Sequence, residues 1–425
     1  MNWKILFAPM TCSLLIIGCS ADAPKLTFAV GGAPNEVEYW ETIIDEFTES
    51  SKIDVVFLRQ PTDTDQRRQG LIIPLKAKKA DPDVFLMDVI WVAQFAASDW
   101  LLPLTSFIER SSLDTSDFFE SVIIQVDQYN GELLALPVYN DCGILYYRKD
   151  LLEEHGFAVP NTWQDLIESA MFIQEKERTS NPQFYGFTWQ GAQYEGLICN
   201  YLEFLVSHNG HIVDTAGDFV ITNAENIRAV NMMKDMIHKY KISPPNTYTE
   251  MKEEEVRLLF EAGNALYERN WPYAWGLHTR DESAVKNLVG ITILPRSDTG
   301  RHAATLGGWH VGISKFSDRK EQALALVEFI LSYDVQKRLA LELGWNPGRR
   351  DLYDDTDINK NMPHIRVLKR AFENAVARPS LPYYTQVSEI MQRHINAILA
   401  ARSEPEIALA RAQEGINKII LQYHE

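Results

Sequence analysis

The segment LTFAVGGAPNEVEYWETIIDEFTESSKIDVVFL, residues 26–58, decides the fold. In its first five residues every second side chain is large and apolar, which predicts a half-buried strand. A glycine-rich break follows, and Trp40, Ile43, Ile44 and Phe47 then recur at the spacing of an amphipathic helix. The last six residues are an apolar run rich in β-branched side chains, which predicts a second strand. Strand, helix and strand in this order predict a βαβ unit with a parallel sheet.

The same alternation continues along the chain. Further strands are expected over residues 83–88, 290–294 and 310–314. Further helices are expected over residues 162–172, 227–240, 321–331, 365–375, 387–399 and 405–423. The predicted class is therefore α/β.

The chain has 425 residues, which is more than one hydrophobic core normally holds, so we expect two lobes. No Gly/Ser-rich linker separates them, which favours several crossings between the lobes. Segments 133–137 and 142–147 are β-rich and flank a short loop at 138–141. We expect one crossing there.

The N-terminus carries Lys4, then an uncharged and mostly apolar stretch up to Ile17, and then Gly18-Cys19. This is the pattern of a signal peptide, and it is too short for a permanent membrane span. An aliphatic residue, a small residue and a cysteine in this order resemble the lipobox of bacterial lipoproteins. The resemblance implies cleavage before Cys19 and lipid on its thiol and amino group. The alternatives are an ordinary signal peptide with a chance cysteine, or a buried apolar helix.

The amino-acid composition limits the classes of binding partner that we expect. The formal net charge is −17, which argues against nucleic acid and anionic membranes as partners. Cys12 would leave with the signal peptide, so Cys142 and Cys199 remain. They form a disulfide or stay as buried free thiols, and the sequence leaves both open.

Motifs of common enzymes are absent: there is no GxxxxGK[ST], GxGxxG, GxSxG or HExxH. His208 and His211 flank an Asn-Gly turn without a further ligand nearby, so we expect no metal site. The charged run containing Arg67 and Arg68 has the pattern of a solvated helix face.

Aromatic and polar residues gather instead in expected loops and at strand ends. Trp271 lies beside a proline and Trp309 follows two glycines, whereas Glu36, Asp88 and Asp141 follow or end β segments. Indole and phenol rings cover the C–H face of a pyranose, and carboxylates accept hydrogen bonds from its hydroxyls. Ligands of parallel α/β sheets bind at the carboxyl ends of the strands. These residues therefore predict a sugar site, whereas Trp40 and Trp163 fit helix cores.

Several long runs together resemble the extracellular solute-binding proteins of family 1, and within them the trehalose/maltose-binding proteins. The runs are residues 28–36, 59–60 with 62–64, 81–89, 189–191 with 193–197, 269–275, 306–310 and 343–349. The resemblance covers almost the whole chain after the signal peptide.

The resemblance implies a periplasmic-binding-protein-like clamshell of type II, with two α/β lobes joined by hinge strands and a sugar between them. It implies an N-terminal lobe of residues 25–136 and 286–340 and a C-terminal lobe of residues 137–285 and 341–425, after a signal peptide (1–18) and a lipidated tether (19–24). Matched position by position, the implied ligand residues are Glu36, Thr62, Arg67, Asp88, Trp91, Tyr139, Asp141, Trp271, Tyr273, Gly307, Trp309 and Arg378. Arg67 is thereby moved from expected surface to expected site. Cys142 departs from the small alanine common in the family.

The expected function is that of a membrane-anchored, extracytoplasmic receptor of an ABC importer. It would bind a disaccharide such as trehalose or maltose as a monomer, without cofactor, metal or turnover. The alternatives are another disaccharide or a maltodextrin as ligand, or a secreted glycoside hydrolase that uses two of Glu36, Asp88 and Asp141.

Overall fold

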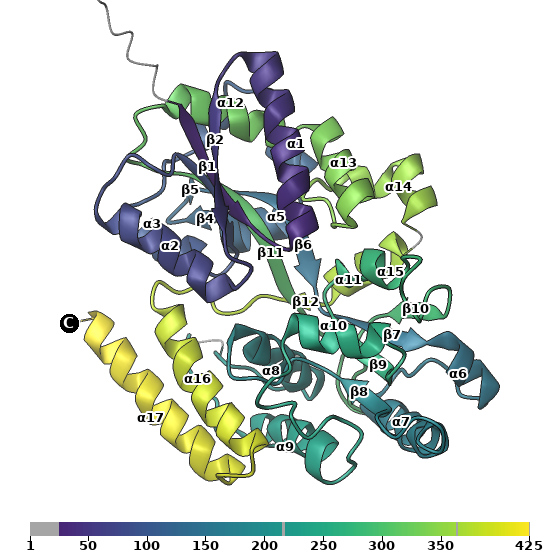
Figure 1. Ribbon diagram of the computed structural model, residues 1–425. Helices are drawn as coiled ribbons and strands as arrows, with labels where there is room; N and C mark the ends of the chain where they lie inside the picture. Colours follow the sequence, from purple (N-terminus) through teal and green to yellow (C-terminus); the bar gives the residue numbers. More distant parts are fainter. Residues whose placement is uncertain (1–24, 215–216, 363, 425) are drawn as a thin grey trace, which may run out of the picture.

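The computed structural model describes residues 25–214, 217–362 and 364–424, which form two α/β lobes, each built on its own sheet (Figure 1). The signal peptide and the lipid at Cys19 fall outside these ranges. Within these ranges, no helix combines the length and the apolar character that a membrane crossing needs.

The first lobe contains a six-stranded mixed sheet. Its strands are β1 (Leu26–Gly31), β2 (Val55–Gln60), β3 (Val84–Asp88), β6 (Leu136–Cys142), β11 (Ala304–Ile313) and β12 (Ala375–Val376). β1 pairs in parallel with β2 and β3, and β11 runs antiparallel to β3 and β6. The expected βαβ unit is confirmed. All six residues of β1 are buried, so the expected half-burial is wrong, because helices cover both faces of this sheet.

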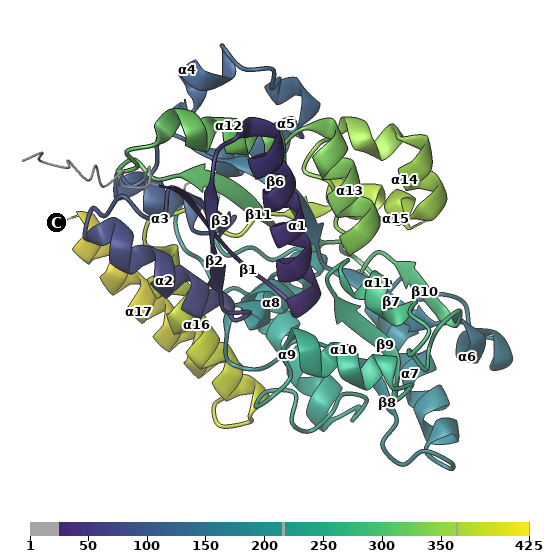
Figure 2. The ribbon, with the colours of Figure 1, turned by 45° about the horizontal axis from the view of Figure 1, so that its top comes forward.

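Helices of the first lobe pack around this sheet. They are α1 (Pro34–Ser51), α2 (Thr64–Lys76), α3 (Val92–Ala97), α4 (Thr105–Ile108), α5 (Glu120–Val122), α12 (Lys320–Ile330) and α13 (Tyr333–Leu343). Short 3₁₀ and π turns, η1 (Thr115–Asp117) and η2 (Ile123–Asp127), and a hairpin of β4 (Gln128–Tyr129) and β5 (Glu132–Leu133) complete it. The predicted stripe of α1, including Trp40 and Phe47, is buried in the same core as α12 and α13. Figure 2 shows these late helices beside α1.

The second lobe contains a four-stranded sheet in the order β10-β7-β9-β8. Its strands are β7 (Ile144–Arg148), β8 (Tyr185–Thr188), β9 (Ala265–Asn270) and β10 (Val289–Thr292). The helices around it are α6 (Lys149–Glu154), α7 (Trp163–Glu177), α8 (Glu195–Ser207), α9 (Ala224–His238), α10 (Glu253–Glu261), α11 (Ala274–His278), α16 (Tyr384–Leu399) and α17 (Pro405–His424). The turn η3 (Asp351–Asp354) and helices α14 (Thr356–Asn361) and α15 (Ile365–Glu373) lie between the lobes and pack with residues of both.

Three segments carry the chain between the lobes: β6 to β7, β10 to β11, and β12 to α16. The first crossing turns at Gly143, where a Cβ atom would overlap the carboxylate of Glu203. The crossing expected near residues 133–147 is confirmed. The loop expected at 138–141 is wrong, because these residues belong to β6 and pair with β11.

The expected division of the lobes is wrong at four places. Residues 137–142 belong to β6 in the first sheet, and β10 (289–292), assigned to the first lobe, pairs with β7 in the second sheet. β12 and Trp345 were both assigned to the second lobe, but β12 pairs with β11 in the first sheet and Trp345 packs in the core of the first lobe. Composition and periodicity do not reveal these errors, because pairing partners distant in sequence decide which sheet a strand joins.

Candidate ligand-binding cleft

A cavity of about 350 Å³ opens between the two lobes. The first lobe contributes the starts of α1 and α2 and residues of β3, β6 and β11, and the second contributes the starts of α8 and α10 and the loop after β9. Of the residues implied by the family resemblance, those in the wall are Glu36, Thr62, Arg67, Asp88, Tyr139, Asp141, Trp271, Tyr273, Gly307, Trp309 and Arg378. Residues more than 300 positions apart therefore meet in one cleft.

Trp91 is the exception, since it does not line the cavity. Its side chain is 1% exposed and stacks on Phe95. Its ring meets Trp309 edge to face, with 5.3 Å between ring centroids. Trp91 supports the cavity-lining indole from behind, so its expected place at the ligand is wrong.

Arg67 contacts the face of the Trp309 ring. Its guanidinium carbon is 3.4 Å from the centroid of the Trp309 ring, a cation–π contact, and its side chain is buried. Arg68 is also buried and donates to Gln94. The solvated face that the charge pattern indicated is therefore wrong for Arg68, whereas Arg67 lies in the cavity wall, where the family resemblance implied it.

Three carboxylates come from the first lobe. Asp88 ends β3, Asp141 lies on β6, and Glu36 lies in the first turn of α1. Burial, together with the negative charges of Glu36 and Asp88, raises the pKa of Asp141 to about 7. Burial likewise raises the pKa of Glu36. The cleft therefore has an acidic wall in which burial opposes the ionisation of Glu36 and Asp141.

Glu36 is held by two donors. Its Oε2 accepts from the backbone N–H of Ala33 at 2.7 Å, and its Oε1 accepts from the indole N–H of Trp345 at 2.9 Å. The Trp345 ring also stacks on Tyr139, with 4.0 Å between centroids. Trp345 thus orients an acid and an aromatic ring of the wall at once.

Trp271 is supported from below by a buried ion pair. The Arg269 guanidinium carbon lies 4.2 Å from the Trp271 ring centroid. Arg269 donates to both carboxylate oxygens of Glu203, and the two side chains are 1% and 2% exposed. Opposite the ring, a Cβ on Gly307 would lie 3.0 Å from an indole carbon. Glycine at 307 therefore leaves room for the ring.

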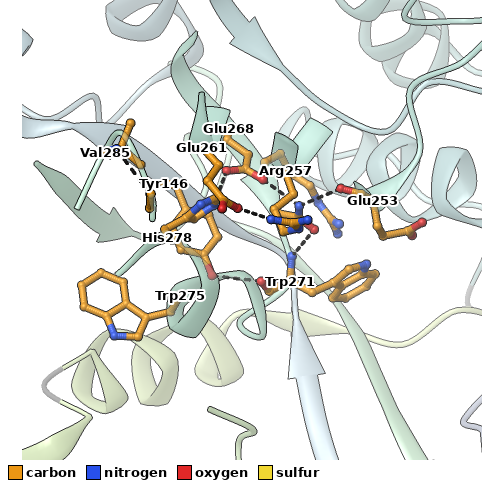
Figure 3. Close-up of polar contacts among 12 residues, drawn as sticks. Tyr146, Glu253, Arg257, Glu261, Glu268, Trp271, Trp275, His278 and Val285 are labelled. Atoms are coloured by element: carbon orange, nitrogen blue, oxygen red, sulfur yellow. Dashed lines mark hydrogen bonds and ion pairs between the residues drawn. The ribbon is translucent and has the colours of Figure 1, made fainter. Parts of the chain in front are cut away.

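The backbone of Trp271 is fixed at both ends, as Figure 3 shows. Its N–H donates to Asn270 Oδ1 at 2.8 Å, and its C=O accepts from the Tyr146 hydroxyl at 2.9 Å. Glu268 accepts from Asn270 Nδ2 and pairs with His278 Nε2, both at 2.6 Å. These hydrogen bonds hold the aromatic loop in place before a ligand arrives, which lowers the entropic cost of binding.

Arg378 connects the lobes across the cleft. It donates to Asp88 of the first lobe at 3.4 Å and to Glu195 of the second at 3.0 Å. Glu195 also accepts from the hydroxyls of Tyr384 and Ser388. At the rim, Lys252 lies 3.6 Å from Asp63 of the facing lobe. The ion pairs join the two lobes around the cavity.

Sequence reasoning missed several residues of the wall. They are Asp63, Asp65, Tyr194, Glu195, Cys199, Lys252, Glu253, Glu254 and Trp345. Tyr194, Glu195 and Trp345 fall inside runs that carry the family resemblance, so a signal existed for them. Lys252 and its acidic neighbours have the sequence pattern of an ordinary charged helix N-terminus, which does not indicate a ligand site. Cys142 and Cys199 are both buried and free.

The wall combines aromatic rings from both lobes with carboxylates and arginines. Trp271, Tyr273 and Trp309 offer flat apolar surface, and Glu36, Asp88 and Asp141 offer hydrogen-bond acceptors. This suits a ligand with apolar faces and hydroxyl edges. The fold and the cleft define a two-lobed solute-binding protein, a clamshell with its site between the lobes.

The chain belongs to the bacterial extracellular solute-binding proteins, whose family model matches residues 33–337. It is 33% identical to a probable ABC transporter-binding protein of Deinococcus radiodurans over 404 residues, 94% of each chain. The structure of maltose-bound MalE3 of T. maritima is 38% identical and superposes with a TM-score of 0.87, covering 93% of this chain and 99% of that one. A tagatose-bound solute-binding protein of Thermotoga lettingae is 26% identical with a TM-score of 0.84, covering 93% and 100%.

Proposed function

We propose that this protein is the sugar receptor of an ABC importer and that it binds a disaccharide, maltose or trehalose, between its lobes. The cleft carries this proposal: aromatic faces from both lobes enclose a cavity rich in carboxylates. The similarity to a maltose-bound protein at 38% identity supports a disaccharide, and the relative named for an ABC transporter supports delivery to a permease. A ligand held by both lobes favours the closed state, which a permease would recognise.

A thermal-shift panel tests the ligand class. Maltose, trehalose, tagatose, ribitol and a set of amino acids are each added at 100 times a micromolar Kd. A bound ligand at that excess stabilises the folded state by roughly 2.7 kcal/mol. We expect the largest shift with a disaccharide. A shift with an amino acid and none with any sugar would overturn the proposal.

Hydrolysis is the second candidate, because a buried carboxyl with a raised pKa beside other carboxylates is also a feature of glycosidases. We propose binding without turnover. Prolonged incubation with maltose and trehalose should release no glucose. Release of many equivalents per protein, abolished in Asp141→Asn, would establish the hydrolase instead.

We also propose that residues 1–18 are a signal peptide and that Cys19 carries lipid, which would hold the receptor outside the cytoplasm beside its permease. The support is the sequence pattern that ends at Gly18-Cys19. Metabolic labelling with a palmitate analogue should mark the wild-type protein and leave Cys19→Ser unmarked. Equal labelling of both would refute the anchor at Cys19.

A further inference from the structure

A second cavity of about 290 Å³ adjoins the cleft. Its wall comes from the start of α1, from α11, from the end of α13, and from residues of α14 and the turn before α15. It shares Ala33, Glu36 and Tyr273 with the first cavity. The two cavities are therefore neighbours that meet at these side chains.

One loop supplies aromatic rings to both cavities. Trp271, Tyr273 and Trp275 occupy alternate positions: Trp271 lines the first cavity only, Tyr273 lines both, and Trp275 lines the second only. Figure 3 shows the two indoles on opposite sides of the polar network that fixes the loop. The aromatic surface suited to a sugar ring thus continues beyond the first cavity.

The second cavity also has an unused polar group. His364 lies in its wall and is 3% exposed, and neither ring nitrogen has a hydrogen-bond partner among the described residues. Its ring packs on Trp275, with 4.8 Å between centroids. Buried polar groups are normally hydrogen-bonded, so an unpaired imidazole in a cavity wall points to a missing partner.

The chemistry of that partner follows from the wall. Burial lowers the pKa of His364 to about 4, so the ring is neutral at physiological pH and can both donate and accept. The rest of the polar wall includes Asn35, Thr279 and Asn361, which hydrogen-bond without net charge, and the charged side chains of Arg280, Glu342 and the shared Glu36. Sugar hydroxyls can donate to the carboxylates and amide oxygens and accept from the guanidinium and amide N–H groups, so they match both parts of this set.

We infer that the second cavity is a subsite for a third glycosyl unit, so that the ligand class extends from disaccharides to trisaccharides. The inference rests on the proposed function, because the first two units must occupy the first cavity. The third unit would leave that cavity past Glu36 and Tyr273. It would then stack on Trp275 and exchange hydrogen bonds with His364.

Gly276 offers a direct test, because a Cβ built on it meets no atom within 4 Å and it lines only the second cavity. Gly276→Phe should fill the subsite without disturbing the first cavity. Gly70→Phe is the matched control: Gly70 lies on helix α2, lines neither cavity, and its Cβ would come no nearer than 3.8 Å to another residue. Trp275→Ala removes the stacking surface as a second, independent variant.

Calorimetric titrations with maltose and maltotriose give the readout. We expect wild-type protein and Gly70→Phe to bind maltotriose more tightly than maltose. Gly276→Phe and Trp275→Ala should lose about tenfold in maltotriose affinity and keep their maltose affinity within about twofold. Maltose binding by each variant also shows that it is folded.

Two outcomes overturn the inference in distinguishable ways. If maltose binds but the variants leave maltotriose affinity unchanged, the subsite is refuted and the proposed function stands. If the wild-type protein binds neither of these sugars and no trehalose, the proposed function fails and the subsite fails with it.

Discussion

The indole N–H of Trp345 donates to Oε1 of Glu36 at 2.9 Å across 309 positions of sequence. Both side chains line the ligand cleft. The donor compensates a carboxylate whose pKa is raised by burial, and it holds Oε1 of that carboxylate in place. This hydrogen bond joins the first turn of α1 to a residue that lies in one of the runs carrying the family resemblance but was not among the implied ligand residues.

Replacing Trp345 by Phe should weaken sugar binding by about tenfold, because it removes a charge-assisted hydrogen bond worth about 1.5 kcal/mol. The phenyl ring keeps the stack on Tyr139. Calorimetric titration with the preferred disaccharide measures the loss. The matched control is Trp163→Phe, which removes an indole hydrogen bond to Ser207 in the core of the second lobe. It should leave affinity unchanged, and an equal loss in both variants would show a general packing effect.

Asp141 makes stability depend on pH. Its pKa is about 7 in the folded protein and near 3.8 when unfolded, so the folded state holds a proton that the unfolded state has released between pH 4 and 7. Stability therefore falls as pH rises through this window, by up to about 1.4 kcal/mol per pH unit.

The Asp141→Asn variant has no carboxyl group at this position, so it cannot take up or release this proton. The free energy of unfolding of the variant, from urea titrations, should exceed that of the wild type by more at pH 8 than at pH 5. The same variant should bind the disaccharide more weakly, because it loses a carboxylate acceptor. If the free energies of unfolding of variant and wild type differ by the same amount at pH 5 and pH 8, the raised pKa of Asp141 is contradicted.

Two adjacent glycines should respond differently to alanine. At Gly307 the new Cβ would press on the Trp271 ring at 3.0 Å, and that half-buried ring can shift. At Gly308 it would meet the Tyr139 carbonyl oxygen at 2.5 Å, and φ is +137°. Gly307→Ala should therefore weaken binding with little loss of stability.

Gly308→Ala should instead destabilise the fold by about 1–3 kcal/mol, since backbone atoms cannot move aside. Thermal unfolding and calorimetry on both variants separate the two effects. Equal losses of stability at both positions would argue against the mobile ring at Gly307.

The buried pair of Glu203 and Arg269 gives a fourth prediction. Glu203→Gln removes one charge of a pair that is at most 2% exposed and leaves Arg269 without its counter-ion. Breaking such a pair costs about 3–5 kcal/mol. Urea unfolding should show this loss. A loss below about 1 kcal/mol, as for exposed pairs, would mean that water reaches Arg269.

The sequence predicted the local helices and strands better than it predicted which strands pair with one another. Periodicity located β1 and α1 correctly, because the spacing of apolar residues within each element shows which of its faces is buried. Periodicity misjudged the burial of β1, and the lobe bounds implied by the resemblance misplaced β6 and β10, because partners distant in the sequence decide both.

The site followed the same rule. Acids at strand ends and tryptophans beside Pro or Gly carry local signals, so Asp88 and Trp271 could be found. Glu195 lies inside a run that carries the family resemblance, but only the folded chain shows that it meets Arg378. Trp91 was misplaced because sequence does not show which of two adjoining indoles faces the cavity.

Calorimetric titration of wild-type protein and Trp271→Ala with maltose and trehalose tests whether the cleft binds a disaccharide through its aromatic wall. We expect saturable binding of one disaccharide per chain, at least about tenfold weaker in Trp271→Ala, with a smaller loss in Trp271→Phe. Unchanged affinity in Trp271→Ala, or no binding of either disaccharide by the wild type, would contradict the sugar-binding cleft.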